Sequence, residues 1–138
     1  MNKEKLLEKM SKLNQNTMAT AIGLELTDIG NDYVCGKIPV DGRTIQPFGY
    51  LHGGASVALA ETIGSLAGQM QVDPDREIVL GVEINANHIK SIREGWIYGK
   101  ASPIKIGKKI HVWEIQITDA EKNVVCISRL TLAVLKKR

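Results

Sequence analysis

Aromatic side chains are scarce in this chain of 138 residues, which has one Phe, two Trp and three Tyr. Proteins that bind single-stranded nucleic acids stack bases on several aromatic rings, and so few rings do not form such an array. The excess of one charge sign is small as well, because 18 basic and 15 acidic residues leave a net charge of only +3. This mild excess suits a small anionic ligand but falls well short of a nucleic-acid-binding surface. We therefore expect no nucleic-acid partner.

Long hydrophobic runs are missing too. No apolar stretch approaches the roughly 20 residues that span a bilayer. The first residues, MNKEKLLEKMSK, are charged throughout and lack the apolar core of a signal peptide. The sequence therefore predicts a cytoplasmic protein with no membrane partner.

Cysteine is represented only by Cys35 and Cys126, which stand apart in apolar, strand-like runs. Neither has the CxxC or Cys/His spacing of a metal site. We expect both thiols to serve as small buried side chains, and we predict no metal site.

The composition is that of one globular domain. Apolar residues make up 43% of the chain and charged residues 24%, which are ordinary values. A chain of this length buries one sizeable core but not two. No repeat, low-complexity stretch or linker interrupts it, so we predict a single domain over residues 1–138.

Most of the chain alternates like a sheet. An amphipathic helix that caps the sheet is expected first, followed by a turn over 16–21. The apolar positions of that helix are Leu6, Leu7, Met10 and Leu13. Strands are predicted over 24–28, 33–40, 78–89, 96–106, 109–118 and 124–135. With one long helix between the second and third of them, the pattern predicts an α+β fold: an antiparallel sheet of about five to six strands wrapped around one helix.

The segment 54–70 is small and apolar on every side, which is typical of a buried helix. Glu61 is its only charge, and no Lys or Arg lies three or four residues away to pair with it. A buried carboxylate is costly unless it is paired or used. Glu61 therefore pairs with a basic residue of the sheet, faces solvent at an edge, or takes part in chemistry.

Two features accompany Glu61. Ser65 lies one turn further on the same helix face, where its hydroxyl either orients a water or bonds back to the Glu61 carbonyl. Gly53 and Gly54 precede the helix and form either a flexible turn or a place where a ligand reaches the free N–H groups. A thioester carbonyl gains negative charge when it is attacked, so these N–H groups are a candidate oxyanion site.

The distance between Gly54 and Glu61 bears on assembly. They are seven residues apart, which is roughly 10 Å along a helix axis. One thioester carbon cannot contact both. If both act on one substrate, a second subunit supplies one of them, and a two-fold dimer with opposed helices makes two shared sites.

His88 ends an alternating run expected on the core face of one strand. The run consists of Val82, Ile84, Ala86 and His88. His88 is either a satisfied histidine at the edge of the core or a ligand contact at the open end of the sheet. The basic side chains that are either solvated or hold phosphates of coenzyme A are Lys90, Arg93, Lys105, Lys108, Lys109 and Arg129.

The segment GYLHGGASVALAETIGSLAG resembles the central helix of hotdog-fold thioesterases of the PaaI-like group. Within that group it is most similar to the 4-hydroxybenzoyl-CoA type, which uses a catalytic glutamate, and to its menaquinone and enterobactin relatives. Three later stretches are similar as well: GVEINANHIKS, IGKKIHVWEIQITD and VCISRLTLAVL. The resemblance thus covers nearly the whole chain.

The resemblance implies a hotdog fold and a homodimer with shared active sites, often paired into a homotetramer. It implies hydrolysis of acyl-CoA thioesters without a metal or other cofactor, since coenzyme A belongs to the substrate. Glu61 is then the nucleophile or the base that activates water. The other catalytic positions are Gln46 and His52 near the thioester, the Gly53 N–H at the carbonyl, and Ser65 at the water. Positions expected to bind the substrate or its coenzyme A part are His88, Gly54, Lys90 and Ser91.

The leading expectation is an acyl-CoA thioesterase for an aromatic acyl group, with 1,4-dihydroxy-2-naphthoyl-CoA of menaquinone synthesis as the specific substrate. A proofreading thioesterase for acyl carrier proteins is a close alternative. A non-catalytic acyl-CoA-binding module is a second class, but it needs no carboxylate beside the scissile bond. A hydratase or dehydratase is a third, although hotdog dehydratases place the His and the acid differently along this helix.

Overall fold

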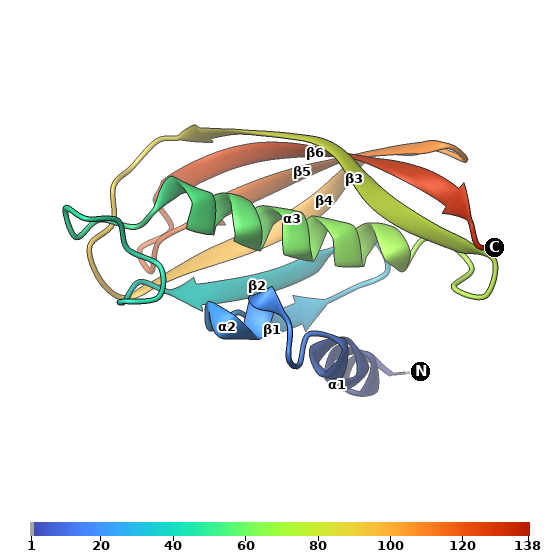
Figure 1. The fold of residues 1–138 in the computed structure, drawn as a ribbon, viewed down its shortest axis with the longest axis horizontal. Helices are drawn as coiled ribbons and strands as arrows, with labels where there is room; N and C mark the ends of the chain where they lie inside the picture. Colours follow the sequence, from blue (N-terminus) through green and yellow to red (C-terminus); the bar gives the residue numbers. More distant parts are fainter. Residues whose placement is uncertain (1) are drawn as a thin grey trace.

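A six-stranded antiparallel sheet curves around one long helix (Figure 1). The computed structural model describes residues 2–138. The strands are β1 Glu25–Ile29, β2 Val34–Pro39, β3 Glu77–His88, β4 Trp96–Ile106, β5 Ile110–Thr118 and β6 Val124–Lys136. The helices are α1 Lys3–Leu13, α2 Met18–Ala21 and α3 Gly53–Gln69. The α+β architecture expected from the sequence is confirmed.

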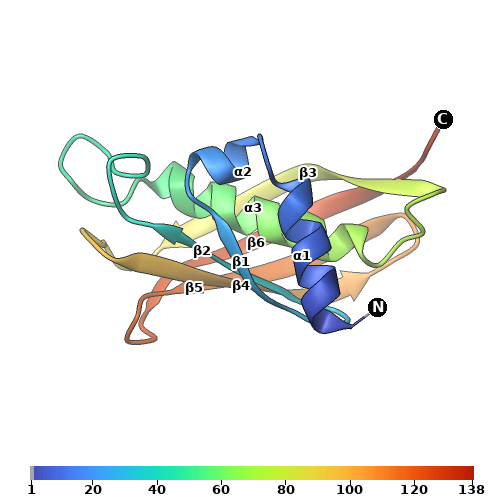
Figure 2. The ribbon, with the colours of Figure 1, turned by 90° about the horizontal axis from the view of Figure 1, so that it is seen from below.

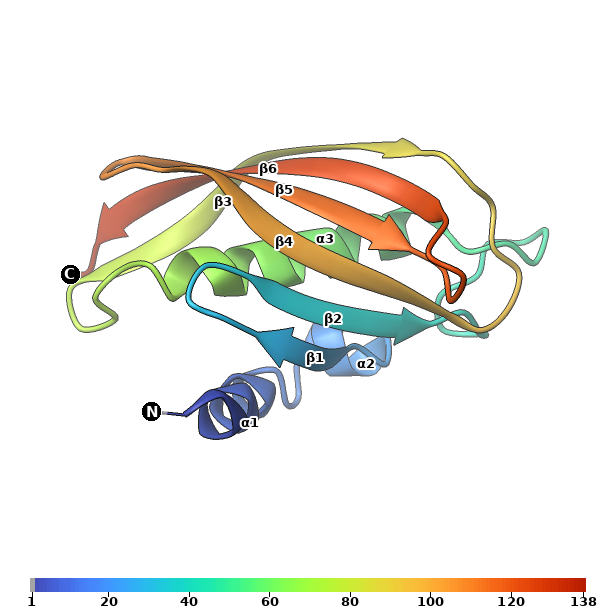
Figure 3. The same ribbon diagram turned by 180° about the vertical axis from the view of Figure 1, so that it is seen from behind.

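The strand order is β1-β2-β4-β5-β6-β3, so β1 and β3 form the two edges (Figure 3). Every predicted strand, and the long helix, begins and ends within one residue of its expected bounds. The segment 16–21, which was expected to be a simple turn, contains the single helical turn α2. None of the helices within residues 2–138 is long and apolar enough to cross a membrane.

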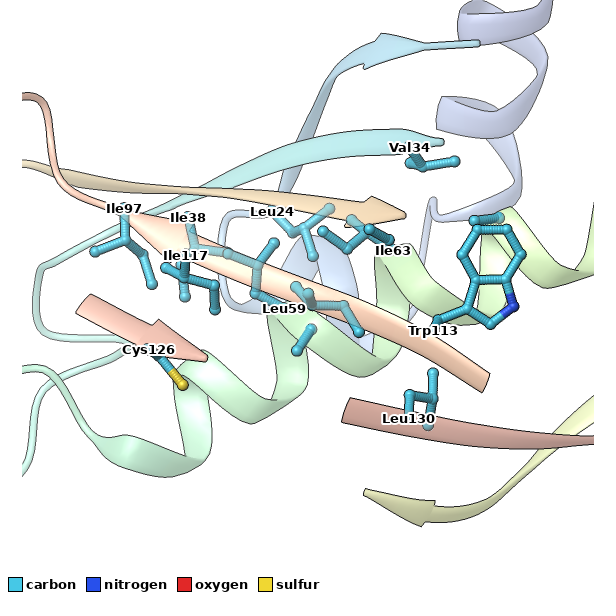
Figure 4. Close-up of a cluster of buried hydrophobic side chains, with 14 of the residues drawn as sticks. Leu24, Val34, Ile38, Leu59, Ile63, Ile97, Trp113, Ile117, Cys126 and Leu130 are labelled. Atoms are coloured by element: carbon cyan, nitrogen blue, oxygen red, sulfur yellow. The ribbon is translucent and has the colours of Figure 1, made fainter. Parts of the chain in front are cut away.

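The core lies between α3 and the concave face of the sheet. Figure 4 shows Leu59 and Ile63 of α3 among Ile38, Ile97 and Ile117 of the strands. The helix residues that are buried share one face: Ser56, Leu59, Ala60, Ile63, Gly64, Ala67 and Gly68. The opposite face is only half-buried, so the expectation of a helix buried on all sides is wrong for the single chain.

The two cysteines differ in burial. Cys126 is fully buried, as expected, whereas Cys35 is only half-buried. Desolvation raises the pKa of both thiols. Neither is therefore activated as a nucleophile, because the reactive form of a cysteine is the thiolate.

A β-bulge divides the edge strand β3. The register against β6 shifts between Gly81 and Glu83, because a bulge places one extra residue on one strand. Val82 was expected on the core face but is 65% exposed. After the bulge, Ile84 and Ala86 pack against the core. The alternation seen in the sequence is thus correct only for the second half of β3.

The N-terminal helix α1 packs at the β1 edge of the sheet (Figure 2). Its apolar residues Leu6, Leu7 and Met10 are partly buried against the core. Leu13, which was expected on the same face, is 60% exposed because it lies in the last turn. The helix is a cap on the sheet, as expected.

An ion pair fixes the segment that leaves β3. The Lys90 ammonium lies 2.6 Å from Asp119 Oδ2 in the turn between β5 and β6. Asp119 also accepts the backbone N–H groups of Glu121 and Asn123 at Oδ1. The hydrogen bond from Lys90, together with those from Asn123, lowers the pKa of Asp119 from its ordinary 3.8 to about 2.

These contacts predict an acid-sensitive contribution to stability. The folded-state pKa of Asp119 lies below the ordinary value, so the stabilisation is present above about pH 4 and is lost as the pH falls towards 2. The Asp119→Asn variant is expected to have a lower Tm than the wild type at neutral pH. The difference in Tm narrows between about pH 5 and about pH 2.5.

Thermal unfolding followed by circular dichroism across this range measures the effect. Asp75→Asn, in the exposed turn before β3, is the matched control and is expected to change Tm little at any pH. A difference between wild type and Asp119→Asn that stays constant down to low pH contradicts the assignment.

Candidate active site

The first candidate region is a pocket at the N-terminal end of α3, with a volume of about 260 Å³. We call it the N-terminal pocket. Its lining residues are Gln46, Leu51, Gly53, Ser56, His88, Ile89, Lys90, Ser91 and Val125. Five predicted site residues therefore meet here, drawn from a loop, a helix and the end of an edge strand.

His52 has a structural role that was not expected. Its Nδ1 accepts the Gly54 N–H at 2.8 Å and caps α3, while its role as a substrate contact stays a prediction. The Gly54 N–H is thereby occupied and is not a free donor for a ligand. Within residues 2–138, the Gly53 N–H donates to no protein acceptor. Gly53 supplies a free backbone donor to the pocket.

His88 covers the start of α3. A Cβ atom on Gly53 would lie 2.8 Å from His88 Nε2, so only glycine lets the ring approach the helix this closely. The ring belongs to the wall of the N-terminal pocket, as the functional interpretation of His88 predicted. In the single chain His88 is exposed.

Gln46 sits on a tight loop. Its backbone N–H donates to the Tyr50 carbonyl at 2.8 Å, and its side-chain Oε1 accepts the Phe48 N–H at 2.5 Å. The Arg93 guanidinium stacks 4.7 Å above the Tyr50 ring and ties the loop to the segment after β3. Because the oxygen of the Gln46 amide is engaged, its N–H₂ is the group left to donate to a ligand.

Lys90 lines the pocket but has a partner for its charge, since its ammonium is bound to Asp119. Its predicted role in holding coenzyme A phosphates therefore competes with an existing ion pair. Ser91, the neighbouring residue, lies in the same wall. We interpret Lys90 as a residue that shapes the pocket.

The second candidate region lies further along α3 and contains Glu61. We call it the Glu61 groove; its volume is about 410 Å³. Its lining residues are Asn14, Glu61, Thr62, Ser65, Leu66, Gln69 and Val79. Glu61 is half-buried, and no basic side chain within residues 2–138 forms an ion pair with it. The alternative of an ion pair with the sheet is therefore wrong for the single chain.

Ser65 shares the groove with Glu61, as the helical spacing predicted. No hydrogen bond in the described part of the chain involves the Ser65 hydroxyl, so it does not bond back to the Glu61 carbonyl. Thr62, in contrast, donates to the Ala58 carbonyl at 2.7 Å. The Ser65 hydroxyl is thus free to orient a water next to the carboxylate.

Gly81 makes room for the Glu61 carboxylate. A Cβ atom on Gly81 would lie 2.5 Å from Glu61 Oε2. Gly81 is also where the β3 bulge begins. Gly81 was not among the predicted site residues, although a glycine inside a strand pattern signals a bulge or a close approach.

Ser56, in the N-terminal pocket, was not among the predicted site residues either. It belongs to the segment 54–70 that was described as small and apolar, and it lies on the buried helix face. A hydroxyl among apolar residues on a buried face is the signal that identifies it.

The two regions remain separate in one chain, and no residue lines both. Gly53 and Glu61 are eight residues apart on α3, which is about 12 Å along the axis. A single subunit therefore carries two partial sites. The described residues include no group of three or more His, Cys, Asp or Glu side chains that could hold a metal ion.

Comparison with known proteins connects this geometry to a family. A model of the Thioesterase superfamily matches residues 48–126, which include both ends of α3. This chain belongs to that family. A solved thioesterase from Haemophilus influenzae superposes with a TM-score of 0.91 and 46% identity, covering 94% of this chain and 90% of that one. The hotdog fold is confirmed.

Two of the relatives have names that state a specific activity. The 1,4-dihydroxy-2-naphthoyl-CoA hydrolase of Escherichia coli is 44% identical over 129 residues, which is 94% of each protein. The proofreading thioesterase EntH of Cronobacter turicensis is 42% identical over 129 residues, which is 94% of this chain and 93% of that protein. The expectation of a thioester hydrolase is confirmed.

The contact between Gly81 and Glu61 yields a prediction for this thioesterase. Gly81→Ala is expected to displace the carboxylate, because the end of the Glu61 side chain moves more easily than the strand. A shift of about 1 Å at a reacting group lowers kcat by about 100-fold, while Tm changes little. Steady-state thioester hydrolysis and thermal unfolding measure the two effects.

Gly42→Ala is the matched control, since a Cβ atom there meets nothing within 4 Å. This variant is expected to keep both kcat and Tm. Wild-type kcat in Gly81→Ala contradicts a role for this contact in placing Glu61.

Proposed function

We propose that this thioesterase hydrolyses an aromatic acyl-CoA, with 1,4-dihydroxy-2-naphthoyl-CoA as the specific substrate, at sites shared between two subunits. The observation that carries the proposal is the pair of partial sites on α3. One offers a free N–H at Gly53, and the other offers a carboxylate at Glu61 without a basic partner. Each supplies half of what thioester hydrolysis requires.

The chemistry follows from these two groups. The Gly53 N–H donates to the thioester carbonyl oxygen and stabilises the negative charge that develops there. Glu61 of the second subunit attacks the carbonyl carbon, or removes a proton from the water that attacks it. Ser65 orients that water. The C–S bond then breaks, and the leaving sulfur takes the proton that Glu61 removed from water, or a proton of solvent if Glu61 attacked directly. In the latter case a water then hydrolyses the mixed anhydride, which releases the acid and frees the Glu61 carboxylate.

The edge strand β3 is the surface that we propose for the dimer. It pairs with β6 on one side and has no neighbour within the described chain on the other. Leu80 is 51% exposed and Val82 is 65% exposed on this strand, and an exposed apolar edge strand readily pairs with another chain. Antiparallel pairing of two β3 strands runs the adjacent α3 helices in opposite directions, and the Gly53 end of one helix then faces Glu61 of the other.

The remaining expectations stay predictions. A homotetramer made of two such dimers, the cytoplasmic location and the lack of a cofactor rest on the sequence. The alternative substrate, an acyl group mischarged on a carrier protein, has the support of the similarity to the proofreading thioesterase. A single methylene in a pocket changes specificity by only about 1–3 kcal/mol. The fold therefore does not distinguish the naphthoyl-CoA substrate from the carrier-protein ester.

A panel of thioesters tests the substrate and the role of Glu61 together. The panel comprises 1,4-dihydroxy-2-naphthoyl-CoA, benzoyl-CoA, phenylacetyl-CoA, straight-chain acyl-CoAs and an aryl carrier-protein ester. We expect the highest kcat/KM for the naphthoyl ester. Glu61→Gln is expected to lower kcat by at least about 100-fold on every member, because it removes the nucleophile or base.

Glu94→Gln, in the exposed turn before β4, is the control and should keep wild-type turnover. A higher kcat/KM for the carrier-protein ester favours the proofreading alternative. Near-wild-type turnover by folded Glu61→Gln contradicts the assigned role.

Complementation tests the shared site. Chains carrying Glu61→Gln and chains carrying Gln46→Ala are each expected to be nearly inactive alone. A mixed dimer has one site with both native residues and one with neither. Random pairing therefore restores about a quarter of wild-type activity per chain, because half of the dimers are mixed and each has one working site.

Co-expression with two different tags measures this recovery in the unfractionated mixture, and the mixed dimer purified through both tags should reach about half of the wild-type activity per chain. The double variant Gln46→Ala/Glu61→Gln paired with itself is the inactive control. No recovery in the mixed dimer indicates that Gln46 and Glu61 act within one chain, and it overturns the shared site.

A further inference from the structure

Ser56 is buried without a hydrogen-bond partner. Its side chain is 1% exposed, and its Oγ is the one buried side-chain polar atom in residues 2–138 that has no partner. Other buried hydroxyls are satisfied: Thr44 donates to the Pro39 carbonyl at 2.6 Å, and Ser128 donates to the Asn85 carbonyl at 2.8 Å. Native proteins leave few such groups unpaired, because each one costs stability.

The usual partner of a helical hydroxyl is also absent. Serine and threonine in helices bond back to the carbonyl four residues earlier, as Ser11 does to Leu7 and Thr62 does to Ala58. Within the described chain, Ser56 makes no such bond to the His52 carbonyl. Its hydroxyl is therefore available for a group that binds from outside the chain.

The position of Ser56 indicates what that group is. Ser56 lines the N-terminal pocket together with Gly53 and His88. It lies three residues after Gly53 on the same helix, and helical side chains lean towards the helix N-terminus. The hydroxyl is thus directed to the turn that presents the free Gly53 N–H.

We propose that the Ser56 hydroxyl is a second hydrogen-bond donor to the thioester carbonyl oxygen, beside the Gly53 N–H. This inference rests on the proposed function. When the nucleophile or water adds to the carbonyl carbon, the C=O electron pair moves to the oxygen, which accepts both hydrogen bonds. When the C=O bond forms again, the C–S bond breaks and the thiolate leaves. Ser56 keeps its proton throughout.

Burial makes this donor effective. A hydrogen bond to a developing charge is stronger in a site that excludes water, and a donor already in place needs no reorganisation. The free protein keeps an unsatisfied hydroxyl, which lowers its stability, and the hydroxyl gains its partner in the transition state. Activity and stability should therefore respond in opposite directions when the hydroxyl is removed.

Ser56→Ala and Ser56→Cys test the proposal. Both remove the strong donor, since an S–H group is only a weak donor. Cys also fills the space that Ala leaves empty. We expect kcat for benzoyl-CoA to fall by about 100-fold in each, the size of the effect of removing one oxyanion donor. KM should change little, and Tm of Ser56→Ala should equal or exceed that of the wild type.

Ser128→Ala is the matched control, because it removes a buried hydroxyl that has a partner. It is expected to lower Tm and leave kcat unchanged. If Ser56→Ala behaves in the same way, the hydroxyl has a structural role, such as holding a buried water, and the proposal is overturned.

Two non-hydrolysed analogues test the contact directly. One is the benzoyl ketone in which CH₂ replaces the sulfur of benzoyl-CoA, and the other is S-benzyl-CoA, which lacks the carbonyl. Ser56→Ala is expected to weaken binding of the ketone and to leave binding of S-benzyl-CoA unchanged. The infrared stretch of the bound ¹³C-labelled ketone should move to higher frequency, because the carbonyl is less polarised. Equal binding of the ketone by wild type and Ser56→Ala overturns the proposal.

The measurements separate this inference from the proposed function. If the wild type is active, Glu61→Gln is inactive and Ser56→Ala is fully active, only the role of Ser56 is overturned and the proposed function stands. A wild type that hydrolyses no aromatic thioester overturns the proposed function, and the comparison of ketone with S-benzyl-CoA still decides whether Ser56 donates to a carbonyl.

Discussion

The packing of α3 against the concave face of the sheet is the interaction on which the active site depends. Leu59 and Ile63 fill the space between the helix and the strands (Figure 4). Rotation of the helix about its axis exposes these side chains to water, and burying such a side chain stabilises the fold by about 1.5–3 kcal/mol. The directions of the other helix residues are thereby set. Gly53 and Glu61 both lie on the side of α3 that faces β3.

The edge strand β3 completes each partial site with one residue. At its centre, Gly81 leaves space for the Glu61 carboxylate, and at its end, His88 lies against Gly53. The bulge lies between these two positions and bends the strand, so that β3 contributes one residue to each partial site. An edge strand with large exposed apolar residues, here Leu80 and Val82, is unusual for a surface that meets only water. Its features agree with a strand that faces a second subunit.

The polar groups of the protein divide into two kinds. Those that hold the scaffold are satisfied, as in the four hydrogen bonds that Asp119 accepts. Those along the first half of α3 lack a partner within the described chain: the Gly53 N–H, the Ser56 hydroxyl and the Glu61 carboxylate. Unsatisfied groups reduce stability, and natural proteins accept this loss where function requires it. Their concentration along one helix marks it as the candidate active site.

The sequence by itself determined the secondary structure and singled out Glu61 as the candidate catalytic residue. Hydrophobic periodicity is a local signal, so strand and helix bounds agree with the structure within one residue. Glu61 was recognisable because it is the single charge in a small, apolar helix. The spacing along that helix was enough to separate Gly54 from Glu61, since the rise per residue does not depend on tertiary contacts.

Only the tertiary structure decided how the other residues contribute. Whether His52 caps the helix, whether Val82 faces outwards at a bulge and whether Ser56 has a partner depend on contacts that local patterns do not encode. The ion pair of Lys90 joins residues 29 positions apart in the chain. Hydrogen bonds of this kind form between segments that the fold brings together, so their partners follow from three-dimensional packing and not from residue order.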